Sequence, residues 1–292
     1  RPATVAAAPV ADAPGSPGAA LLEAVARAER EVRYVGYKTA ISGPGDDGRR
    51  TRMKVSRDAS GRTHMEWEAG GREERRWVYR QRHRWIDDPA LLLAAYDVQG
   101  DDAVDERVAW RPARRVEIRP RHAGRPSMTL LVDEETSLVL AETIRDATGE
   151  TRFRWRFDTI EVGGTASAAA PGDRTAAAEP VAAPQDTTVV VRAGWRPLEV
   201  AWLPEGFRQV AGEPLQRGGE RVYYSDGLAA FSVVQRPAEG VEAAAEGQLV
   251  TQECGGRARV AGTFDGVSVE IAGLLLSASE LERVAAGLRT RP

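Results

Sequence analysis

The sequence has only one cysteine, Cys254, in its 292 residues. A single cysteine excludes an intramolecular disulfide framework and a cysteine-rich zinc site, and we expect a small buried or idle thiol here rather than a nucleophile. The chain also lacks a run of about 18 apolar residues, the length that a membrane-spanning helix needs. The sequence therefore predicts a chain that does not span a membrane and that folds without covalent staples.

Signatures of common enzymes are missing too. The chain has no G-x-S-x-G elbow and no G-x-x-x-x-G-K-[ST] phosphate loop. Its three histidines, His64, His83 and His122, are far apart and form no H-E-x-x-H motif. The acidic clusters lack the one-in-two spacing of a calcium loop. We therefore predict a binding protein without catalytic residues, metal or cofactor. An enzyme that assembles its site from distant residues stays open as an alternative.

Lysine is nearly absent, because Lys38 and Lys54 are the only lysines among 40 basic residues. This arginine bias indicates a GC-rich coding sequence. The formal net charge is −3, but the stretch from Arg49 to Trp85 carries 12 basic and five acidic residues. Since the rest of the chain is acidic and has no basic motif with interleaved aromatics, we expect no nucleic-acid partner.

Hydrophobic residues make up 42% of the chain, and its length is enough for two domains that each bury a core. Residues 1–19 contain almost no large apolar side chain, so we expect a disordered arm that remains after removal of an export signal or that reflects an artificial start. Residues 163–186 have the Ala/Pro-rich composition of a linker. We therefore expect one domain over residues 20–162 and a second over residues 187–292.

The first domain begins with a helix pattern over residues 20–31 and then changes to the period of two that is typical of half-buried strands. Asp88 as N-cap and Pro89 at the first helical position predict a short helix over residues 88–96. Turn signals between the strand runs predict an antiparallel meander with one solvated face. A plain core is one reading of the aromatic face. The other is an open groove for an acyl chain or an apolar peptide. The candidate groove residues are Trp67, Trp77, Tyr79, Trp85, Met128, Leu130, Phe153, Trp155 and Phe157.

The second domain is expected to be a small α+β unit of about 100 residues. Its most informative segments are W-L-P-E-G-F, starting at Trp202, and a hairpin whose turn is Ser225, Asp226 and Gly227. The other expected elements are strands at 188–192, 222–224, 229–235 and 267–271, and a last helix capped by Ser277 or Ser279. Aromatic residues around the hairpin either bind a partner or pack into the core of the domain. They are Trp202, Phe207, Tyr223, Tyr224 and Phe231.

Several segments resemble the sigma-E factor regulatory proteins of the RseB/MucB family. They are DPALLLAAYDV, RVAWRPARRVEIRPR and LLVDEETSLVLAETIRDATGETRFRWRFDTIEV in the first half, and WLPEGF, SDGLAAFSVVQ and VSVEIAGLLLSASELERVAAGL in the second. WLPEGF with SDGLAAFSVVQ is the most specific pair, whereas Asp133, Glu135, Thr136 and Leu138 recur in lipoprotein carriers generally. The sequence departs from the family at Trp110, where the family usually has glycine, and the extra bulk is expected to alter the adjoining groove.

The resemblance covers about residues 20–290. It implies an α+β fold, in which an antiparallel half-barrel like that of the lipoprotein carriers LolA and LolB has helices on its concave face and is followed by a smaller domain. It also implies a non-catalytic periplasmic regulator, exported with a signal peptide that is absent from this sequence. The small-domain aromatics would bind the extracytoplasmic segment of a membrane-anchored anti-sigma factor.

The aromatic groove of the half-barrel would then sense acyl lipid or lipopolysaccharide during envelope stress. The alternative is a periplasmic carrier or chaperone of lipids or lipoproteins. The sequence leaves open whether the protein forms a homodimer.

Overall fold

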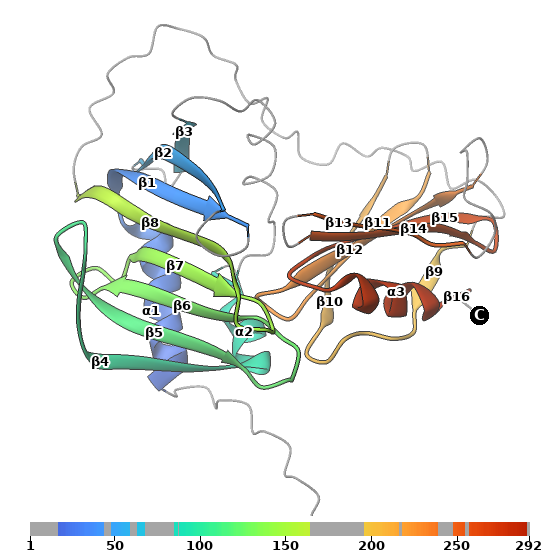
Figure 1. Cartoon of the computed structure of the whole chain (residues 1–292), viewed down its shortest axis with the longest axis horizontal. Helices are drawn as coiled ribbons and strands as arrows, with labels where there is room; N and C mark the ends of the chain where they lie inside the picture. Colours follow the sequence, from blue (N-terminus) through green and yellow to red (C-terminus); the bar gives the residue numbers. More distant parts are fainter. Residues whose placement is uncertain are drawn as a thin grey trace, which may run out of the picture.

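The computed structural model describes residues 17–43, 48–58, 63–67, 85–86, 88–163, 196–215, 218–238, 248–254 and 257–290, without the side chains of Trp67, residues 102–105 and Cys254. Two antiparallel sheets lie side by side, and three helices accompany them in this part of the chain (Figure 1). The helices are α1 (Pro17–Glu31), α2 (Pro89–Ala95) and α3 (Ala278–Ala286).

The larger sheet has eight strands in the order β3-β2-β1-β8-β7-β6-β5-β4. They are β1 (Tyr34–Ser42), β2 (Arg49–Arg57), β3 (Thr63–Trp67), β4 (Tyr96–Val108), β5 (Arg111–Pro120), β6 (Ser127–Asp133), β7 (Val139–Arg145) and β8 (Thr151–Val162). From β4 to β8 each strand pairs with the next one in the sequence, as the turn signals predict. Strand β8, the last strand of this sheet in the sequence, also pairs with β1, the first one. The edge strands of the sheet are therefore β3 and β4.

Helix α1 crosses one face of this sheet (Figure 1), and that face contains the core of what we call the large half, residues 17–163. Leu22 and Val25 on the helix are fully buried against apolar side chains of the sheet. Glu29 is also buried, because its carboxylate accepts a hydrogen bond from the backbone N–H of Val139. The expected helix therefore exists, and it begins three residues earlier than the pattern predicts.

The smaller sheet has six strands in the order β10-β11-β12-β15-β14-β13. They are β10 (Arg208–Pro214), β11 (Glu220–Ser225), β12 (Ala230–Pro237), β13 (Val250–Cys254), β14 (Arg257–Phe264) and β15 (Val267–Leu274). A two-stranded sheet of β9 (Leu198–Val200) and β16 (Leu288–Thr290) accompanies it. The buried side chain of Gln235 hydrogen-bonds both the N–H and the C=O of Leu198, which fixes β9 to β12.

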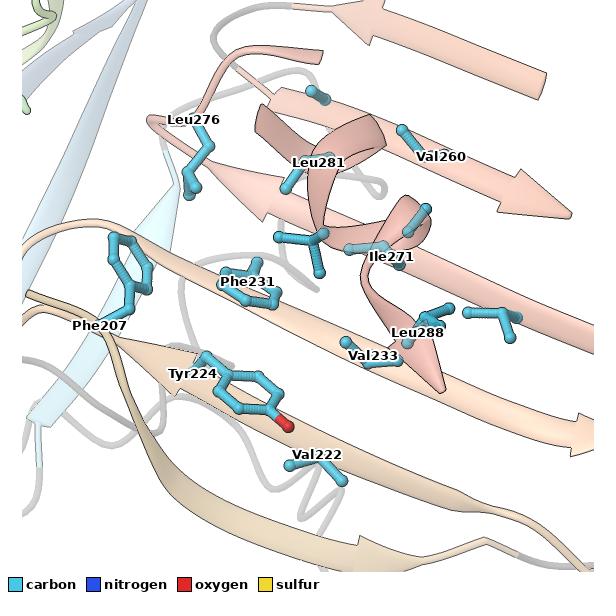
Figure 2. Close-up of a cluster of buried hydrophobic side chains, with 14 of the residues drawn as sticks. Phe207, Val222, Tyr224, Phe231, Val233, Val260, Ile271, Leu276, Leu281 and Leu288 are labelled. Atoms are coloured by element: carbon cyan, nitrogen blue, oxygen red, sulfur yellow. The ribbon is translucent and has the colours of Figure 1, made fainter. Parts of the chain in front are cut away.

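Helix α3 packs on the smaller sheet and closes its core (Figure 2). Ser277 is the N-cap and forms a capping box with Glu280, so the first of the two predicted caps is the one used. Leu281 and Val284 of the helix meet Ile271 of β15 in one apolar cluster. We call the described residues 196–290 the small half.

The chain is therefore mostly β, with few helices in the part that the structure describes. The predicted hairpin is present as β11 and β12, and the predicted helix at 88–96 is α2. Strands β10, β13 and β14 were not predicted, because they contain few aromatic or large apolar residues in alternation. The expected strand at 188–192, residues 1–16 of the arm and nearly all of the linker lie outside the described residues. Residues 17–19, which were expected to belong to the disordered arm, instead form the start of α1.

Trp110 does not add bulk to the face of the sheet. Ala109 and Trp110 form the turn between β4 and β5, with φ angles of 48° and 69°, and the Trp110 side chain is 89% exposed. Two successive positive φ angles are typical of the tight hairpin turn that matches strand twist, and glycine adopts them without strain. The glycine that the family usually has here thus fits a backbone requirement.

Candidate partner-binding site and the joint between the halves

Three of the five predicted partner-binding residues are core residues of the small half. Phe207, Tyr224 and Phe231 are buried, with Tyr224 stacked on Phe231 at 4.9 Å and Phe207 tilted against Phe231 at 5.5 Å (Figure 2). Their hydrophobic surface stabilises the small half itself. Because their rings are buried, they cannot contact a partner with their ring faces. They can only support the backbone of a surface that does.

Trp202 and Tyr223 are half-buried and offer more surface. The guanidinium of Arg283 lies 4.3 Å from the Trp202 ring centroid, a cation–π contact that holds the indole beside α3. Tyr223 follows the strand alternation and lies on the opposite face from Tyr224, where its hydroxyl donates to Glu213 at 2.9 Å. The structure therefore does not bring all five residues together on one surface.

Several of the predicted groove residues are core residues of the large half. Trp85, Met128, Leu130 and Phe157 are buried in the core of the large half, whereas Phe153 and Trp155 are half-buried. Trp77 and Tyr79 lie outside the described residues, and Trp67 is described only as a β3 residue whose backbone pairs with Met53. Among the predicted groove residues whose side chains the structure describes, Phe153 and Trp155 are therefore the ones with accessible surface.

A lysine that the sequence analysis did not select lies on the same aromatic cluster. The Lys38 ammonium is 3.7 Å from the Trp155 centroid and 4.3 Å from that of Phe157. The rings of Trp155 and Phe157 meet edge to face at 5.9 Å. An ammonium over aromatic faces is attracted by the ring quadrupoles. This cluster can therefore present one positive charge at the edge of an apolar surface.

The predicted hairpin turn of the small half docks on the large half. Asp226 is fully buried, and its carboxylate accepts hydrogen bonds from the N–H groups of Leu228 and Ala229 in its own turn and from the Tyr96 hydroxyl of the large half at 3.0 Å. A Cβ on Gly227 would come within 2.6 Å of the Leu92 Cα in α2. Only glycine permits this approach of the two backbones.

Further contacts surround this turn. Leu228 packs against the same apolar cluster of the large half that contains Leu92. Arg125, in the β5–β6 loop, is 7% exposed and pairs with Glu280 in the first turn of α3. Its guanidinium also lies 5.4 Å from the Phe207 ring centroid. We call the contacts of α2, Tyr96 and Arg125 with residues 226–228 and Glu280 the joint.

Two ion pairs lie at the edge of the joint. Arg208 of β10 pairs at 3.0 Å with Asp88, whose other carboxylate oxygen caps α2. The Nδ1 atom of His122 lies 3.2 Å from the Oε2 atom of Glu205. Both pairs are largely exposed on at least one side, so each contributes little to stability. They favour one orientation of the small half at the N-terminus of α2.

Burial raises the pKa values of the two central groups of the joint. Burial is the largest cause for Asp226, whose pKa lies above its usual value although its three hydrogen bonds and the nearby charge of Arg125 favour the carboxylate. Burial also raises the pKa of Tyr96 well above its usual value, and the Asp226 carboxylate adds to this effect. Tyr96 donates its hydroxyl hydrogen bond to Asp226, and burial makes the ionised form of this aspartate costly.

The sequence analysis assigned Asp226 and Gly227 to a turn and missed their role in the joint. Tyr96, Arg125 and Glu280 were not selected either. The available signal was that two segments of the family resemblance, DPALLLAAY and SDGLAAF, come from different halves of the chain. The structure brings these two segments into contact. Among the described residues, no group of three or more His, Cys, Asp or Glu residues could hold a metal ion, and no helix is long and apolar enough to cross a membrane.

Comparison with known proteins shows a family to which this chain is similar. Residues 73–179 match the model of the MucB/RseB N-terminal domain. The sigma factor AlgU regulatory protein MucB of Pseudomonas aeruginosa is 30% identical over 160 residues, which are 52% of this chain and 48% of MucB. The match thus spans about half the length of that relative.

Solved structures extend the likeness to both halves. A crystal structure of MucB in complex with MucA(peri) has a TM-score of 0.65 at 20% identity and covers 94% of this chain and 99% of that one. The Pseudomonas aeruginosa MucA/MucB complex gives 0.64 at 21% identity, with coverage of 94% and 98%. MucB alone gives 0.53 at 22% identity, with coverage of 95% and 100%.

The two sheets and their joint define a two-part, mostly β protein with a MucB-like fold. Its N-terminal half matches the MucB/RseB N-terminal domain over residues 73–179, which confirms the resemblance recognised in the sequence.

Proposed function

We propose that this protein is a non-catalytic periplasmic regulator that binds the extracytoplasmic segment of a membrane-anchored anti-sigma factor. The observation that carries the proposal is a MucB-like fold over both halves, together with 30% identity to a sigma factor regulatory protein over 160 residues. Two of the similar structures contain MucA, the periplasmic part in one of them, so a fold of this shape can hold such a segment.

In this proposal the two halves have separate tasks and correspond to domains over residues 20–162 and 187–292. The small half contributes to the anti-sigma surface through Trp202 and Tyr223, supported from within by the stacked Tyr224 and Phe231. Trp202 and Tyr223 are half-buried aromatic side chains of the kind that peptide-binding surfaces commonly use as anchors. Binding shields the segment from proteolysis.

The large half is proposed to act as a half-barrel that senses acyl lipid or lipopolysaccharide. Phe153 and Trp155 provide half-buried aromatic surface, and Lys38 provides a positive charge directly beside it. An apolar surface that ends in a cation matches an acyl chain that ends in a phosphate or carboxylate. Release of the anti-sigma segment on lipid binding would couple envelope damage to the sigma factor.

Binding of the anti-sigma segment can be tested with purified protein. The extracytoplasmic segments of the single-span anti-sigma factors encoded in the source genome are titrated into the protein in a calorimeter. We expect at least one to bind with a micromolar or lower dissociation constant, the range of specific standard-size interfaces. A Trp202→Ala variant should bind more weakly, whereas Asp158→Asn, an exposed change on the large sheet, should not. Failure of every segment to bind would refute the proposal.

A periplasmic carrier of lipids or lipoproteins is the second candidate. The aromatic face with Lys38 favours it, whereas the small half and its joint have no evident use in a simple carrier. Native mass spectrometry of the protein from its own periplasm distinguishes the two. A carrier retains acyl ligands at near-full occupancy, while a regulator in unstressed cells is expected to be free of them and bound to the anti-sigma segment.

A further inference from the structure

The joint is an interface whose central polar groups are poorly compensated. Asp226 carries a buried carboxylate, and its compensating positive charge, Arg125, lies in the other half. In the described part of the chain, no acceptor lies within hydrogen-bond distance of the Arg125 Nε and Nη1 atoms, although both are buried. Burying charges that are incompletely paired costs free energy. The joint therefore combines apolar contacts with buried charged groups whose incomplete pairing favours opening.

Helix α2 connects this interface to the core of the large half. Leu92 is fully buried in the cluster that contains Leu22 of α1 and Met128 of β6, and its backbone is the surface on which Gly227 rests. The N-cap of the same helix, Asp88, is paired with Arg208 of the small half. This seven-residue helix contacts the small half at its N-cap through Asp88 and along one side through Leu92. A shift of the helix would therefore loosen the joint.

We propose that the joint is a releasable latch, which fixes the orientation of the two halves through the Tyr96–Asp226 hydrogen bond and the Arg125–Glu280 pair, with α2 as the element that the halves share. In its closed state both halves face the bound segment in one arrangement. This consequence for partner binding rests on the proposed function, whereas the latch itself does not. The TM-scores are higher for the two MucA-bound MucB structures than for MucB alone.

The orientation of the halves can be measured by spin-label distances in the full chain. Labels are attached at Ala147→Cys in the large half and Gln252→Cys in the small half, both exposed positions, in a Cys254→Ser background. Tyr96→Phe removes only the hydroxyl of the latch, and Asp226→Ala removes the group that accepts its hydrogen bond. We expect one narrow distance distribution for the labelled chain with an unmodified latch. Each of the two latch variants should give a broad or shifted distribution.

Tyr223→Phe is the matched control, because it removes a tyrosine-to-carboxylate hydrogen bond of similar length, 2.9 Å, inside the small half. Its distance distribution should remain narrow. In the two latch variants, hydrogen exchange of the α2 amides should become faster while the strands of both sheets keep their protection. Unchanged distances in both latch variants, or equal broadening in the control, would overturn the latch.

Partner affinity separates the two proposals. If opening leaves the competent orientation populated at about a tenth, the apparent dissociation constant of the anti-sigma segment rises about 10-fold in Tyr96→Phe. An unchanged affinity together with a broadened distance would refute the role of the latch in binding and leave the proposed function intact. Absence of binding by the unmodified protein would refute the proposed function, while the distances would still decide the latch.

Discussion

Two hairpin turns of this protein each contain a buried aspartate, and the two carboxylates have opposite roles. Asp133, the last residue of β6, is 1% exposed, and Asp226, between β11 and β12, is 0% exposed. Asp133 finds all its hydrogen-bond partners in the large half, including both ends of the Arg111 guanidinium. Asp226 needs Tyr96 and Arg125 from the other half.

The electrostatics follow this difference. For Asp133, burial alone would raise the pKa, but the hydrogen bonds from Arg111 and Thr136 outweigh it and lower the pKa. For Asp226, burial outweighs the hydrogen bonds and raises the pKa. A buried aspartate with a local arginine therefore stabilises one half, whereas a buried aspartate whose partners lie across an interface makes that interface sensitive to conditions.

The largest expected effect comes from Asp133→Asn. It leaves the partly buried Arg111 with only the exposed Glu135 as a charge partner, so the large half should lose about 3 kcal/mol of unfolding free energy, as measured by urea denaturation. Asp146→Asn is the control, since Asp146 also caps a turn and pairs with an arginine, Arg152, but is more exposed. It should cost about 1 kcal/mol. Equal losses would contradict the distinct status of Asp133.

A pH titration should separate the two aspartates by sign. The pKa of Asp133 is lower in the folded chain, so its stabilisation is complete above its ordinary pKa of 3.8 and is lost as pH falls through the lower folded value. The pKa of Asp226 is raised in the closed joint, so the closed form binds the extra proton and gains stability as pH falls from that raised value towards 3.8.

The check uses unfolding of Asp133→Asn and spin-label distances of Asp226→Asn, each against the unmodified chain. The pH dependence of the large half should flatten in the first variant. In the unmodified chain, acidification should narrow the distance distribution further, and this additional narrowing should be absent in the second variant. A latch that opened on acidification in the unmodified chain would contradict the sign derived for Asp226.

Ser225→Ala should have a smaller effect, confined to the small half. The Ser225 hydroxyl donates to the carbonyl of Ala229 and accepts from the N–H of Gly227, so it holds the turn from within. Its loss should lower the unfolding free energy of the small half by about 1 kcal/mol. The hydrogen bond from Tyr96 to Asp226 should remain. Calorimetry of the chain with Thr251→Val, which removes an exposed hydrogen bond to Glu282, gives the baseline.

Trp110→Gly should have the smallest effect and the opposite direction. The tryptophan holds a φ of 69° while its side chain contacts solvent, so glycine relieves strain without loss of packing. We expect the unfolding free energy of the large half, measured by urea denaturation, to rise by only about 0.5 kcal/mol. The gain is small because glycine also raises the entropy of the unfolded chain, which opposes folding. Ser137→Gly, at a φ of 62° in the Asp133 turn, serves as a comparison within the same sheet. A loss of stability in Trp110→Gly would show that the indole packs on another surface.

Much of the fold could be predicted because its signals are local. Asp88 followed by Pro89 specifies the start of α2, and Ser277 with Glu280 specifies the start of α3. The alternation around Phe157 predicts its buried position in β8. Strands β13 and β14 could not be predicted in this way, because their burial depends on α3 and on neighbouring strands.

The candidate site was harder to predict, because aromatic residues have the same pattern in a core and at an interface. Phe207 and Phe231 were expected partner residues and lie in the core of the small half, while Trp202 keeps surface beside Arg283. Lys38 gave only the weak signal of being a rare lysine. Its role follows from the pairing of β1 with β8, which places it opposite Phe157.

The sequence by itself determined the antiparallel meander, the hairpin of the small half, the short capped helices and the resemblance to the MucB/RseB family. These depend on periodicity, caps and turn residues that act over a few positions. Only the tertiary structure decided that Asp226 is buried and not a solvated turn residue, because Tyr96, Leu92 and Arg125 lie about 100 or more positions away in sequence. Burial and charge pairing depend on distance in space, which no local pattern specifies.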